Sequence, residues 1–392
     1  MFEHVETYPG DPILSLMDDY QRDPRTDKVN LSIGFYYDEQ GQVPVLKSVR
    51  QARALLLAQP EAANLYLPMD GQADFRQAVQ RYLFAETDSE RIVTLQSVGG
   101  SGALRVGADF LKRWYPQAQV WVSDPTWDNH LAIFQGAGFV VNRYPYLAAD
   151  GQQVDFPHML EVFASLPANS IVLLHACCHN PTGVDLEPWQ WDALYGLFRE
   201  RALIPFLDAA YLGLGQGLDE DAYAIRALAR AGIAGLVSNS FSKVFSLYGE
   251  RVGSLSVVCD SVAIAGRVAG QLKGTVRTNY SNPPRHGAEL VATILAHPEL
   301  GVLWREELDG MRARMLAMRR ALHARLRRLA PGLPADYLLQ QKGMFSYTGL
   351  SAAAVDRLRE QHGVYLIRSG RMCVAGLNEA NLEQVARALS DH

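Results

Sequence analysis

Cysteine is scarce in this chain, and its scarcity excludes a scaffold held together by disulfides. The 392 residues include four cysteines, and two of these are the neighbours Cys177 and Cys178. Neighbouring cysteines are poorly placed to bridge each other, so we expect free thiols in a reducing environment. The N-terminal residues lack both a basic leader and an apolar segment, so we expect no signal peptide and a cytoplasmic location.

Long apolar runs and a surplus of basic charge are absent as well. The chain has no run of about 18 or more apolar residues, so we expect no membrane span. Its formal net charge of -5 argues against a nucleic-acid partner, which would need a basic face. Small anionic substrates stay compatible with an acidic chain, because a few buried arginines suffice to bind them.

The length of the chain predicts two domains, since single domains usually run to about 100–200 residues. In the middle of the chain, short apolar runs alternate with helical patterns, which predicts a mostly parallel sheet covered by helices. We therefore expect a large α/β domain over residues 44–311, with a helix at 188–202. The clearest apolar runs are residues 120–123, 170–174, 203–207, 235–238 and 254–258.

The C-terminal part has a different pattern. The arginines between its apolar residues could form a nucleic-acid patch, but the acidic total charge favours a solvated helix face. Ser351 is a candidate N-cap and Gly363 a candidate C-terminal stop of a shorter helix. With two short strands and a final helix, we expect a smaller α+β domain of residues 1–43 and 312–392. A long helix is predicted by a stripe with spacings of three and four, formed by Met311, Met315, Met318, Leu322, Leu326 and Leu329.

Polar residues just after the predicted strands are candidate functional residues, because an open parallel sheet binds ligands at the carboxyl ends of its strands. The Gly-Gly-Ser-Gly segment 99–102 precedes a helical pattern, so it is either a phosphate site at a helix N-terminus or a tight turn. The segment from His179 and Asn180 to Gly183 is either a simple turn or a functional loop. A metal site at Cys178 and its neighbours is disfavoured, since consecutive residues lack the usual ligand spacing.

Two further strand ends carry ionisable side chains. Asp208, with Tyr211 close behind it, is either a helix N-cap or a carboxylate that faces a protonated ring nitrogen. Lys243 ends a Ser-Phe-Ser-Lys segment, where a lysine is seldom placed for packing and can act as an amine nucleophile. A phosphate cradle, an acid, a phenol and a lysine together meet the needs of pyridoxal phosphate. The nearby phosphate donors are Ser240, Ser242 and Arg251.

Six motifs follow one another along the chain: Cys178-His-Asn-Pro-Thr-Gly183, Asp208-x-x-Tyr211, Ser240-x-Ser-Lys243, Tyr248-Gly-Glu-Arg251, Asn279-Tyr-Ser-Asn-Pro-Pro284 and Ser369-Gly-Arg371. Together they resemble the aspartate/aromatic aminotransferase family, the class I branch of the fold-type-I pyridoxal-phosphate enzymes. Segments 66–71, 241–248 and 371–378 are most similar to its bacterial aromatic-amino-acid (tyrosine) aminotransferases. The resemblance spans nearly the whole chain, and it implies an α/β fold with a seven-stranded, mostly parallel sheet beside the smaller α+β domain.

The resemblance implies roles for the matching residues at the cofactor, pyridoxal 5'-phosphate. Lys243 would carry the cofactor as a Schiff base and move the substrate proton, while Asp208 would keep the ring nitrogen protonated. Asn180 and Tyr211 would hydrogen-bond the phenolic oxygen of the ring, and Trp127 would stack on it. The phosphate would be bound by Gly100, Ser101, Ser240, Ser242, Arg251 and, from the neighbouring subunit, Tyr66.

For the substrate, the resemblance implies that Arg371 binds the α-carboxylate. Arg277 from the neighbouring subunit would bind a side-chain carboxylate. Gly34 would lie in a segment that closes over the substrate, and Trp127 and Asn180 would also contact it. Active sites shared in this way imply a homodimer.

Three further residues stand beside these sites. His130 and His175 would support the cofactor site as neighbours of its first contacts. Arg368 departs from the family pattern, and it would either disturb the specificity or face solvent.

The implied activity is a ping-pong transamination. It would move the amino group of aromatic (tyrosine, phenylalanine) and acidic (aspartate, glutamate) amino acids to 2-oxoglutarate. An aspartate aminotransferase of narrow specificity and a non-catalytic ligand-sensing protein on the same fold are the alternatives. The order of preference among tyrosine, phenylalanine, aspartate and leucine stays open.

Overall fold

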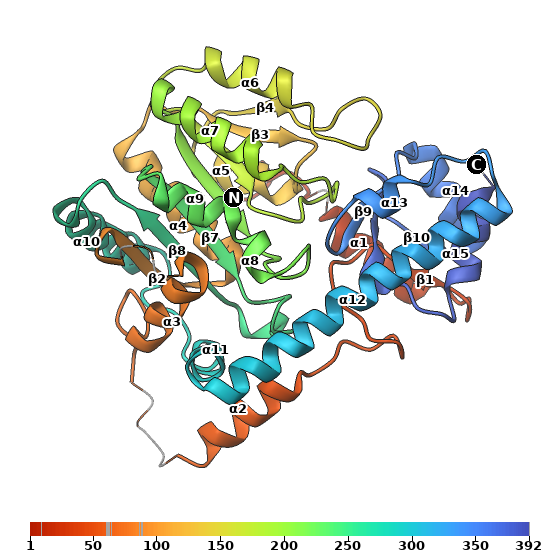
Figure 1. The fold of residues 1–392 in the computed structure, drawn as a ribbon, viewed down its shortest axis with the longest axis horizontal. Helices are drawn as coiled ribbons and strands as arrows, with labels where there is room; N and C mark the ends of the chain where they lie inside the picture. The colour runs from red at the N-terminus through yellow and green to blue at the C-terminus, as the bar shows by residue number, and fades with distance from the viewer. Residues whose placement is uncertain (9, 60–62, 64, 86, 88, 392) are drawn as a thin grey trace. The chain divides into compact units, whose positions relative to one another are not determined.

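The computed structural model describes residues 1–8, 10–59, 63, 65–85, 87 and 89–391 (Figure 1). The chain divides into two compact units. The larger unit is Pro44–Ala313, and the smaller one combines Met1–Val43 with Arg314–His392. Across the described residues, no helix combines the length and the apolar character that crossing a bilayer requires.

A seven-stranded sheet forms the centre of the larger unit, in the order β2-β8-β7-β6-β5-β3-β4. From β7 through β6, β5 and β3 to β4 the neighbours are parallel, whereas β8 runs antiparallel to both β2 and β7. The expected mostly parallel sheet is therefore confirmed. The strands are β2 (Ile92–Val98), β3 (Val120–Asp124), β4 (Val141–Pro145), β5 (Ile171–His175), β6 (Ile204–Ala209), β7 (Gly235–Ser240) and β8 (Val252–Val258).

Each of the five apolar runs expected to be strands overlaps a strand, with Ser170 and Leu203 lying one residue before theirs, but β2 and β4 are missed by the apolar pattern. β4 pairs only with β3 at the edge of the sheet and carries the polar residues Asn142 and Arg143. In β2, Thr94 and Gln96 interrupt the apolar residues, although both are buried against the rest of the unit. Strands with polar side chains therefore escape a search for continuous apolar runs.

The register of the central strands aligns polar residues at their carboxyl ends. β6 continues beyond the predicted end through Asp208 to Ala209, so Asp208 is a strand residue and not a helix N-cap. His175 is the partner of Asp208 on β5, and Ser238 is its partner on β7. The sheet thus places an imidazole, a carboxylate and a hydroxyl side by side on neighbouring strands.

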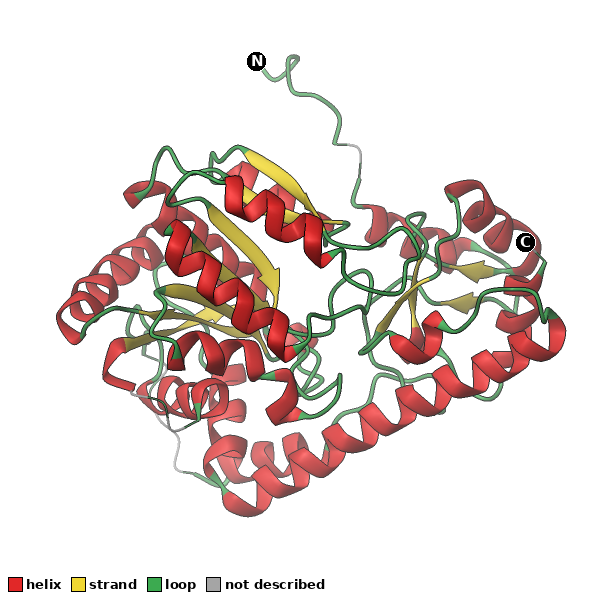
Figure 2. Ribbon diagram, turned by 45° about the horizontal axis from the view of Figure 1, so that its top comes forward, coloured by secondary structure: helices red, strands yellow, loops and turns green. Residues whose placement is uncertain are grey.

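Helices lie in front of and behind the sheet in the larger unit (Figures 1 and 2). One face is covered by α4, α5 and α10, whose apolar side chains form a common core with the strands. The helices are α2 (Lys47–Leu57), α3 (Ala73–Phe84), α4 (Gly99–Trp114), α5 (Asp128–Gly136), α6 (Phe156–Ser165), α7 (Pro188–Arg201), α8 (Leu218–Asp221), α9 (Tyr223–Arg230), α10 (Val262–Asn279), α11 (His286–Ala296) and the first part of α12 (Pro298–Leu329), with short 3-10 turns at η1 (Ser89–Arg91) and η2 (Tyr248–Glu250).

The smaller unit joins the first 43 residues to the C-terminal part of the chain. Its strands form a parallel pair, β1 with β10, and an antiparallel pair, β9 with β11. These pairs and the helices enclose a separate apolar core. The elements are α1 (Pro12–Arg22), β1 (Val29–Asn30), the second part of α12, α13 (Tyr337–Gln340), β9 (Phe345–Tyr347), α14 (Ala352–His362), β10 (Val364–Tyr365), β11 (Arg371–Cys373), η3 (Val374–Gly376) and α15 (Leu382–Ser390).

The helix signals of the C-terminal part are confirmed, with two corrections. Ser351 caps α14 by accepting a hydrogen bond from the Ala354 amide, and Gly363 ends that helix in the left-handed conformation. The long helix begins earlier than its apolar stripe, at Pro298. Arg319 is not part of a solvated face, since only 2% of it is exposed.

A test of the packing between α4 and the sheet uses Gly107. A Cβ atom at Gly107 would lie 2.5 Å from Cζ of the buried Phe206 ring, so Gly107→Ala should lower the unfolding free energy by about 1–3 kcal/mol. Gly196, in the middle of α7, has no atom within 4 Å of such a Cβ. Gly196→Ala is therefore the matched control and should stabilise the chain by up to about 1 kcal/mol. Urea denaturation of both variants checks this, and an equal response would contradict the close approach at Gly107.

Candidate active site

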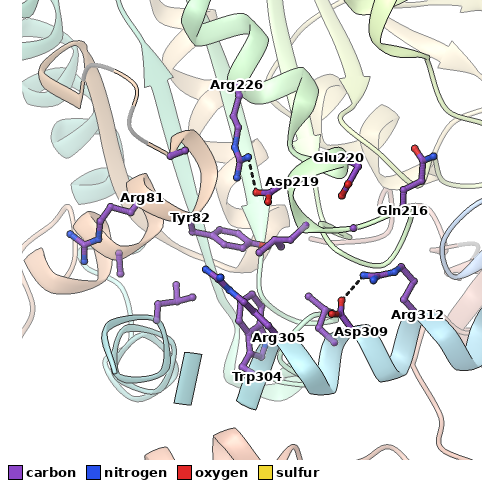
Figure 3. Close-up of a pocket in the computed structure, with 16 residues that line it drawn as sticks. Arg81, Tyr82, Gln216, Asp219, Glu220, Arg226, Trp304, Arg305, Asp309 and Arg312 are labelled. Carbon is purple, nitrogen blue, oxygen red and sulfur yellow. Dashed lines mark hydrogen bonds and ion pairs between the residues drawn. The ribbon is translucent and has the colours of Figure 1, made fainter. Parts of the chain in front are cut away.

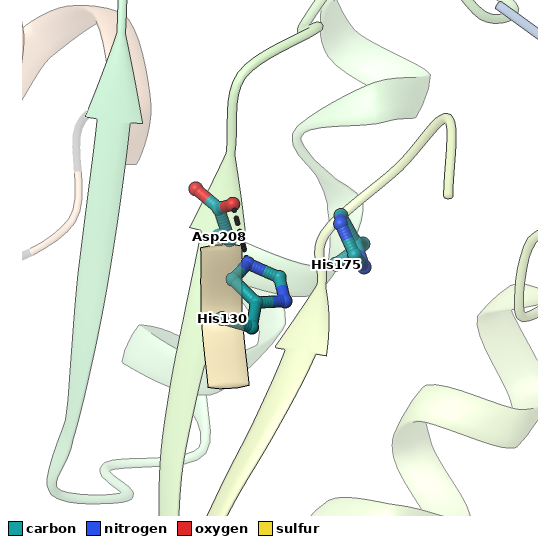
Figure 4. Close-up of side chains that lie close together, drawn as sticks. All are labelled: His130, His175 and Asp208. Atoms are coloured by element: carbon teal, nitrogen blue, oxygen red, sulfur yellow. Dashed lines mark hydrogen bonds and ion pairs between the residues drawn. The ribbon is translucent and has the colours of Figure 1, made fainter. Parts of the chain in front are cut away.

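A buried carboxylate stands at the end of β6. Asp208 is 5% exposed, and each of its oxygens has a partner. Oδ2 lies 3.1 Å from Nε2 of His130 on α5 (Figure 4). Oδ1 accepts a 2.6 Å hydrogen bond from the Ser238 hydroxyl on β7. Three separate elements therefore fix the position of this carboxylate.

The surroundings of Asp208 keep it ionised. Burial by itself raises the pKa of this carboxyl, because a charge is poorly solvated inside the protein. Hydrogen bonds from His130 and Ser238, together with the charge interaction of the nearby imidazoles, outweigh burial and hold the pKa at about 2. At neutral pH the site thus contains a buried negative charge, which favours a cationic group facing it.

The rings of His130, His175 and His179 follow one another from Asp208 into the interior. The ring of His175 lies 4.9 Å from that of His130 and 4.5 Å from that of His179, measured between centroids. Burial lowers the pKa of His175 to about 3 and that of His179 well below its usual value. Both rings are therefore neutral at physiological pH and leave Asp208 as the charged group.

The second ring nitrogen of His130 and both ring nitrogens of His179 also have hydrogen-bond partners. Nδ1 of His130 shares a 2.9 Å hydrogen bond with the Thr126 hydroxyl. His179 is held by hydroxyls on both nitrogens, with Ser123 at 2.9 Å and Thr182 at 2.8 Å. Such bonds fix ring orientation, so the imidazole next to Asp208 cannot turn away without losing a partner.

The segment 99–102 forms the first turn of α4, so its glycines lie at a helix N-terminus. Gly99 has a φ of +65°, and a Cβ there would lie 2.5 Å from Nη2 of Arg251. A Cβ at Gly100 would lie 3.1 Å from Cβ of Ser240. Only glycines let the start of this helix come so close to an arginine and a serine hydroxyl.

Most of the expected phosphate donors lie around this helix start. Arg251 Nη1 donates a 3.3 Å hydrogen bond to Ser242 Oγ, and the Ser242 amide donates to Ser240 Oγ at 3.3 Å. Ser101 lies in the first turn of α4, and its hydroxyl accepts a 3.5 Å hydrogen bond from the side-chain amide of Asn129. No side chain caps the N-terminus of α4 among the residues described. The backbone amides and the positive end of the helix dipole thus suit an anion.

The lysine and the phenol of the predicted set lie together. Lys243 Nζ stands 5.1 Å from the centre of the Tyr211 ring. Asn180 is 4% exposed, and the loop before it is held by Asp185, which accepts hydrogen bonds from the amides of residues 178 and 179 at 2.8 Å each. Trp127 precedes α5 and packs edge-on against the His130 ring at 5.3 Å.

The smaller unit contains a buried arginine expected to bind the substrate. Arg371 is 4% exposed, and its Nη2 donates a 2.6 Å hydrogen bond to the carbonyl of Ser32. Its guanidinium carbon lies 4.4 Å from the centre of the Phe345 ring, which makes a cation–π contact. A Cβ at Gly34 would lie 3.0 Å from Cζ of the same ring. Gly34 and Arg371, both expected at the substrate, therefore share Phe345 as a neighbour.

The strand beneath Arg371 is held by the buried Arg319. Its guanidinium donates to the carbonyls of Leu338, Gly343 and Phe345 at 3.3, 3.0 and 2.6 Å, and to the Ser346 hydroxyl at 2.6 Å. β9 pairs with β11, where Cys373 is opposite Phe345. Arg319 thus fixes the strand that carries the Phe345 ring.

Three arginine or tyrosine positions lie apart from these clusters. Tyr66 is 90% exposed. Arg277 lies exposed near the end of α10, with Nη1 2.5 Å from the Ser281 hydroxyl. Arg368 pairs with Asp356 at 2.8 Å, and its side chain is 67% exposed. Of the two alternatives for Arg368, the solvent-facing one holds.

Several residues that shape the site carry no signal in the local sequence. Ser238, Thr126 and Asp185 bind Asp208, His130 and the loop before Asn180, and Phe345 supports Arg371. No local motif identifies them, because each acts through a partner distant in the sequence. Only the strand register could have suggested Ser238.

Two groups of side chains in the described part of the chain could hold a metal ion by proximity. One is His130, His175 and Asp208, and it coincides with the carboxylate site. The other is Cys177, Cys178 and Asp221, whose ligand atoms lie within 4.8 Å of one another. The Asp221 carboxylate already accepts hydrogen bonds from the amides of residues 213, 215 and 216, so it serves first to hold that loop.

Comparison with known proteins bears on this arrangement. The family model for aminotransferases of class I and II matches residues 26–389. The tyrosine aminotransferase of Klebsiella pneumoniae is 59% identical over 392 residues, covering 99% of each chain. The aspartate aminotransferase of Pseudomonas aeruginosa is 48% identical over 396 residues, covering 99% of this chain and 98% of its own. The Burkholderia pseudomallei aromatic-amino-acid aminotransferase, solved covalently bound to pyridoxal phosphate, has a TM-score of 0.96 and 47% identity, covering 100% of this chain and 99% of its own.

The neutral histidines make stability depend on pH. His175 has a folded pKa of about 3, whereas the unfolded chain titrates near its ordinary value. The unfolded state therefore binds the extra proton first, and stability is lost as the pH falls from the ordinary value towards 3. Between pH 7 and pH 5 this amounts to roughly 2 kcal/mol for one such histidine. We expect His175→Gln to reduce the fall in unfolding free energy over this interval.

The control for this prediction is the exposed His158. A hydrogen bond to Asp155 raises the pKa of His158, so its contribution to stability grows as the pH falls. His158→Gln should therefore leave the acid sensitivity in place or make it slightly steeper. Denaturant titrations at both pH values measure the difference. Identical pH dependence in His175→Gln and the unmodified chain would contradict the buried neutral state of His175.

Proposed function

Because this chain belongs to the class I and II aminotransferases, we propose that it moves the amino group of aromatic and acidic amino acids to 2-oxoglutarate by a ping-pong mechanism. The observation that carries this proposal is the ionised Asp208 at the carboxyl edge of the sheet, in the same unit as the Lys243–Tyr211 pair and the uncapped N-terminus of α4. A family member could share the fold without this set of groups. The presence of these groups in one unit of this chain supports transamination.

Pyridoxal phosphate fits the residues of the larger unit. Its phosphate suits the start of α4, where glycines leave room beside Arg251 and where Ser240 and Ser242 offer hydroxyls. Gly100 and Ser101 supply the first amides of that helix. The negative charge of Asp208 complements a protonated ring nitrogen, and Trp127 offers an aromatic face nearby.

The bound cofactor supplies an electron-withdrawing ring that makes the substrate α-hydrogen acidic. Asp208 would stabilise the positive charge on the ring nitrogen, and His130 and Ser238 keep the carboxylate in the ionised form that this requires. Lys243 Nζ would take the proton from the substrate α-carbon and deliver it to a carbon atom of the cofactor. Tyr211 and Asn180 would hydrogen-bond the ring oxygen and so orient the ring.

Substrate recognition would depend on two arginines with different surroundings. Arg371 is buried and fixed by Ser32 and Phe345, so it suits the α-carboxylate that all substrates share. Arg277 lies exposed, so it can pair with a side-chain carboxylate or turn to water when the side chain is aromatic. Gly34 would lie in the segment that closes over the substrate, and it has no side chain to crowd the Phe345 ring. This division of roles would let one enzyme accept both classes of amino acid.

The proposal includes a homodimer in a cytoplasmic setting. Tyr66 and Arg277 lie at the surface of their own chain, which supports the expectation that they act at the neighbouring active site. Buried free thiols at all four cysteines are compatible with a reducing compartment. The second candidate function is an aspartate aminotransferase of narrow specificity, favoured by the 48% identity to the Pseudomonas aeruginosa protein.

Half-reactions with single amino acids test the proposed function. We expect tyrosine, phenylalanine and aspartate, each added to the cofactor-loaded protein, to convert the cofactor to its amino form at comparable rates, followed by absorbance. Conversion by aspartate alone would establish the narrow alternative, and conversion by none would indicate a ligand-sensing protein. Lys243→Ala is the control, since it removes the proton-transfer group and should abolish conversion by every donor.

The role of Asp208 gives a second test. Asp208→Ala removes the charge that stabilises the ring nitrogen, so kcat should fall by on the order of 10³-fold or more. Ser238→Ala removes only one hydrogen bond to that carboxylate and should lower kcat by about tenfold. Steady-state kinetics of both variants, loaded with cofactor, measures the contrast. A loss of only a few-fold in Asp208→Ala would mean that the carboxylate is structural.

A further inference from the structure

The larger unit contains a cavity of about 640 Å³, and none of the residues assigned to the proposed reaction lines it. Its walls are α3, the loop that leads into α8, α9, and the part of α12 that precedes residue 314 (Figure 3). This volume lies within the range of about 300–1,000 Å³ that small-molecule sites occupy. All the lining residues belong to one compact unit, so the cavity is a feature of that unit alone.

Charged residues of both signs line the cavity, and some of them neutralise each other. Arg226 pairs with Asp219 at 2.8 Å, and Arg312 pairs with Asp309 at 2.7 Å. Three more charged side chains lie in the lining, namely Arg81, Arg305 and Glu220. Within the described part of the chain, none of these three takes part in an ion pair. The cavity therefore offers both positive and negative groups to a ligand.

These remaining charges come from different walls. Arg305 extends from α12 and Glu220 from the segment opposite it, and Figure 3 shows the Tyr82 ring between their ends. A ligand that carries a carboxylate and an ammonium group can satisfy both walls at once, whereas a simple anion leaves Glu220 unpaired and repelled. We propose that this cavity is a binding site for a free zwitterionic α-amino acid, separate from the transamination site.

The cavity also has an apolar side that fits an amino-acid side chain. Trp304 and Tyr82 pack edge to face with ring centres 6.0 Å apart, beside Leu218 and Leu308. The indole N–H of Trp304 donates to the Val244 carbonyl at 2.8 Å, so this buried ring in the cavity lining leaves no polar atom unsatisfied. An apolar or aromatic side chain is therefore preferred over a charged one.

The charged wall is pre-formed by its own hydrogen bonds. Asp221 accepts from the amides of residues 213, 215 and 216, and Arg312 donates to the Gly213 carbonyl at 2.9 Å. A side chain at Gly217 would collide with the Glu220 carboxylate, so the glycine leaves room for that carboxylate beside the loop. A ligand would therefore meet an ordered wall and would lose little free energy in ordering it.

The test measures binding without turnover. The probe is α-methyl-L-phenylalanine, which has no α-hydrogen to lose, titrated calorimetrically into the cofactor-loaded Arg371→Leu protein, whose transamination site lacks its carboxylate partner. We expect one binding event per chain, weakened about tenfold or more when Arg305→Glu is added. Arg320→Glu is the matched control, since it makes the same charge change at an exposed position of α12 outside the cavity, and it should leave the affinity unchanged.

The zwitterion requirement has its own measurement. 3-Phenylpropionate, which lacks the ammonium group, should bind the cavity more weakly than the amino-acid probe, and Glu220→Gln should remove that difference. An Arg371→Leu protein that binds no probe would overturn the proposal, as would binding that Arg305→Glu and Arg320→Glu weaken equally. Neither result depends on which amino acids the enzyme transaminates, so the two proposals fail independently.

Discussion

The ionised carboxylate of Asp208 is the constraint on which the arrangement of the larger unit depends. A buried charge of this kind is tolerated only when its oxygens are hydrogen-bonded and a positive group can face it. His130 and Ser238 meet the first condition, and they can do so because β5, β6 and β7 are in a register that aligns their carboxyl ends. The mostly parallel sheet thus carries a chemical function: it brings side chains from separate strands to one edge.

The histidines behind Asp208 extend the same principle. The rings of His175 and His179 are buried and neutral, and hydroxyl groups fix the orientation of His130 and His179. Because the rings of His175 and His179 carry no charge, they leave the negative charge of Asp208 uncancelled. The polar interior therefore keeps the buried carboxylate anionic, as water would, and also holds it in one position, which water could not do.

The arginines show how differently one residue type can be used. Arg319 is buried to hold the backbone of β9, and Arg371 is buried against Phe345 with one edge bound to Ser32. Arg277 and Arg305 lie exposed, where a guanidinium can exchange partners at low cost. Burial holds a guanidinium to one set of partners, whereas exposure leaves it able to change partners.

The sequence by itself determined the mostly parallel sheet, the capped helix after Ser351 and the residues of the cofactor motifs, because apolar runs, cap residues and glycine-rich turns are local signals. It also carried the family resemblance that the comparisons confirm. The tertiary structure alone decided that Asp208 is a strand residue between His175 and Ser238, that Arg319 is buried, and that Arg368 faces Asp356. Partners such as these lie far apart in the chain, and only strand register and packing determine which of them meet.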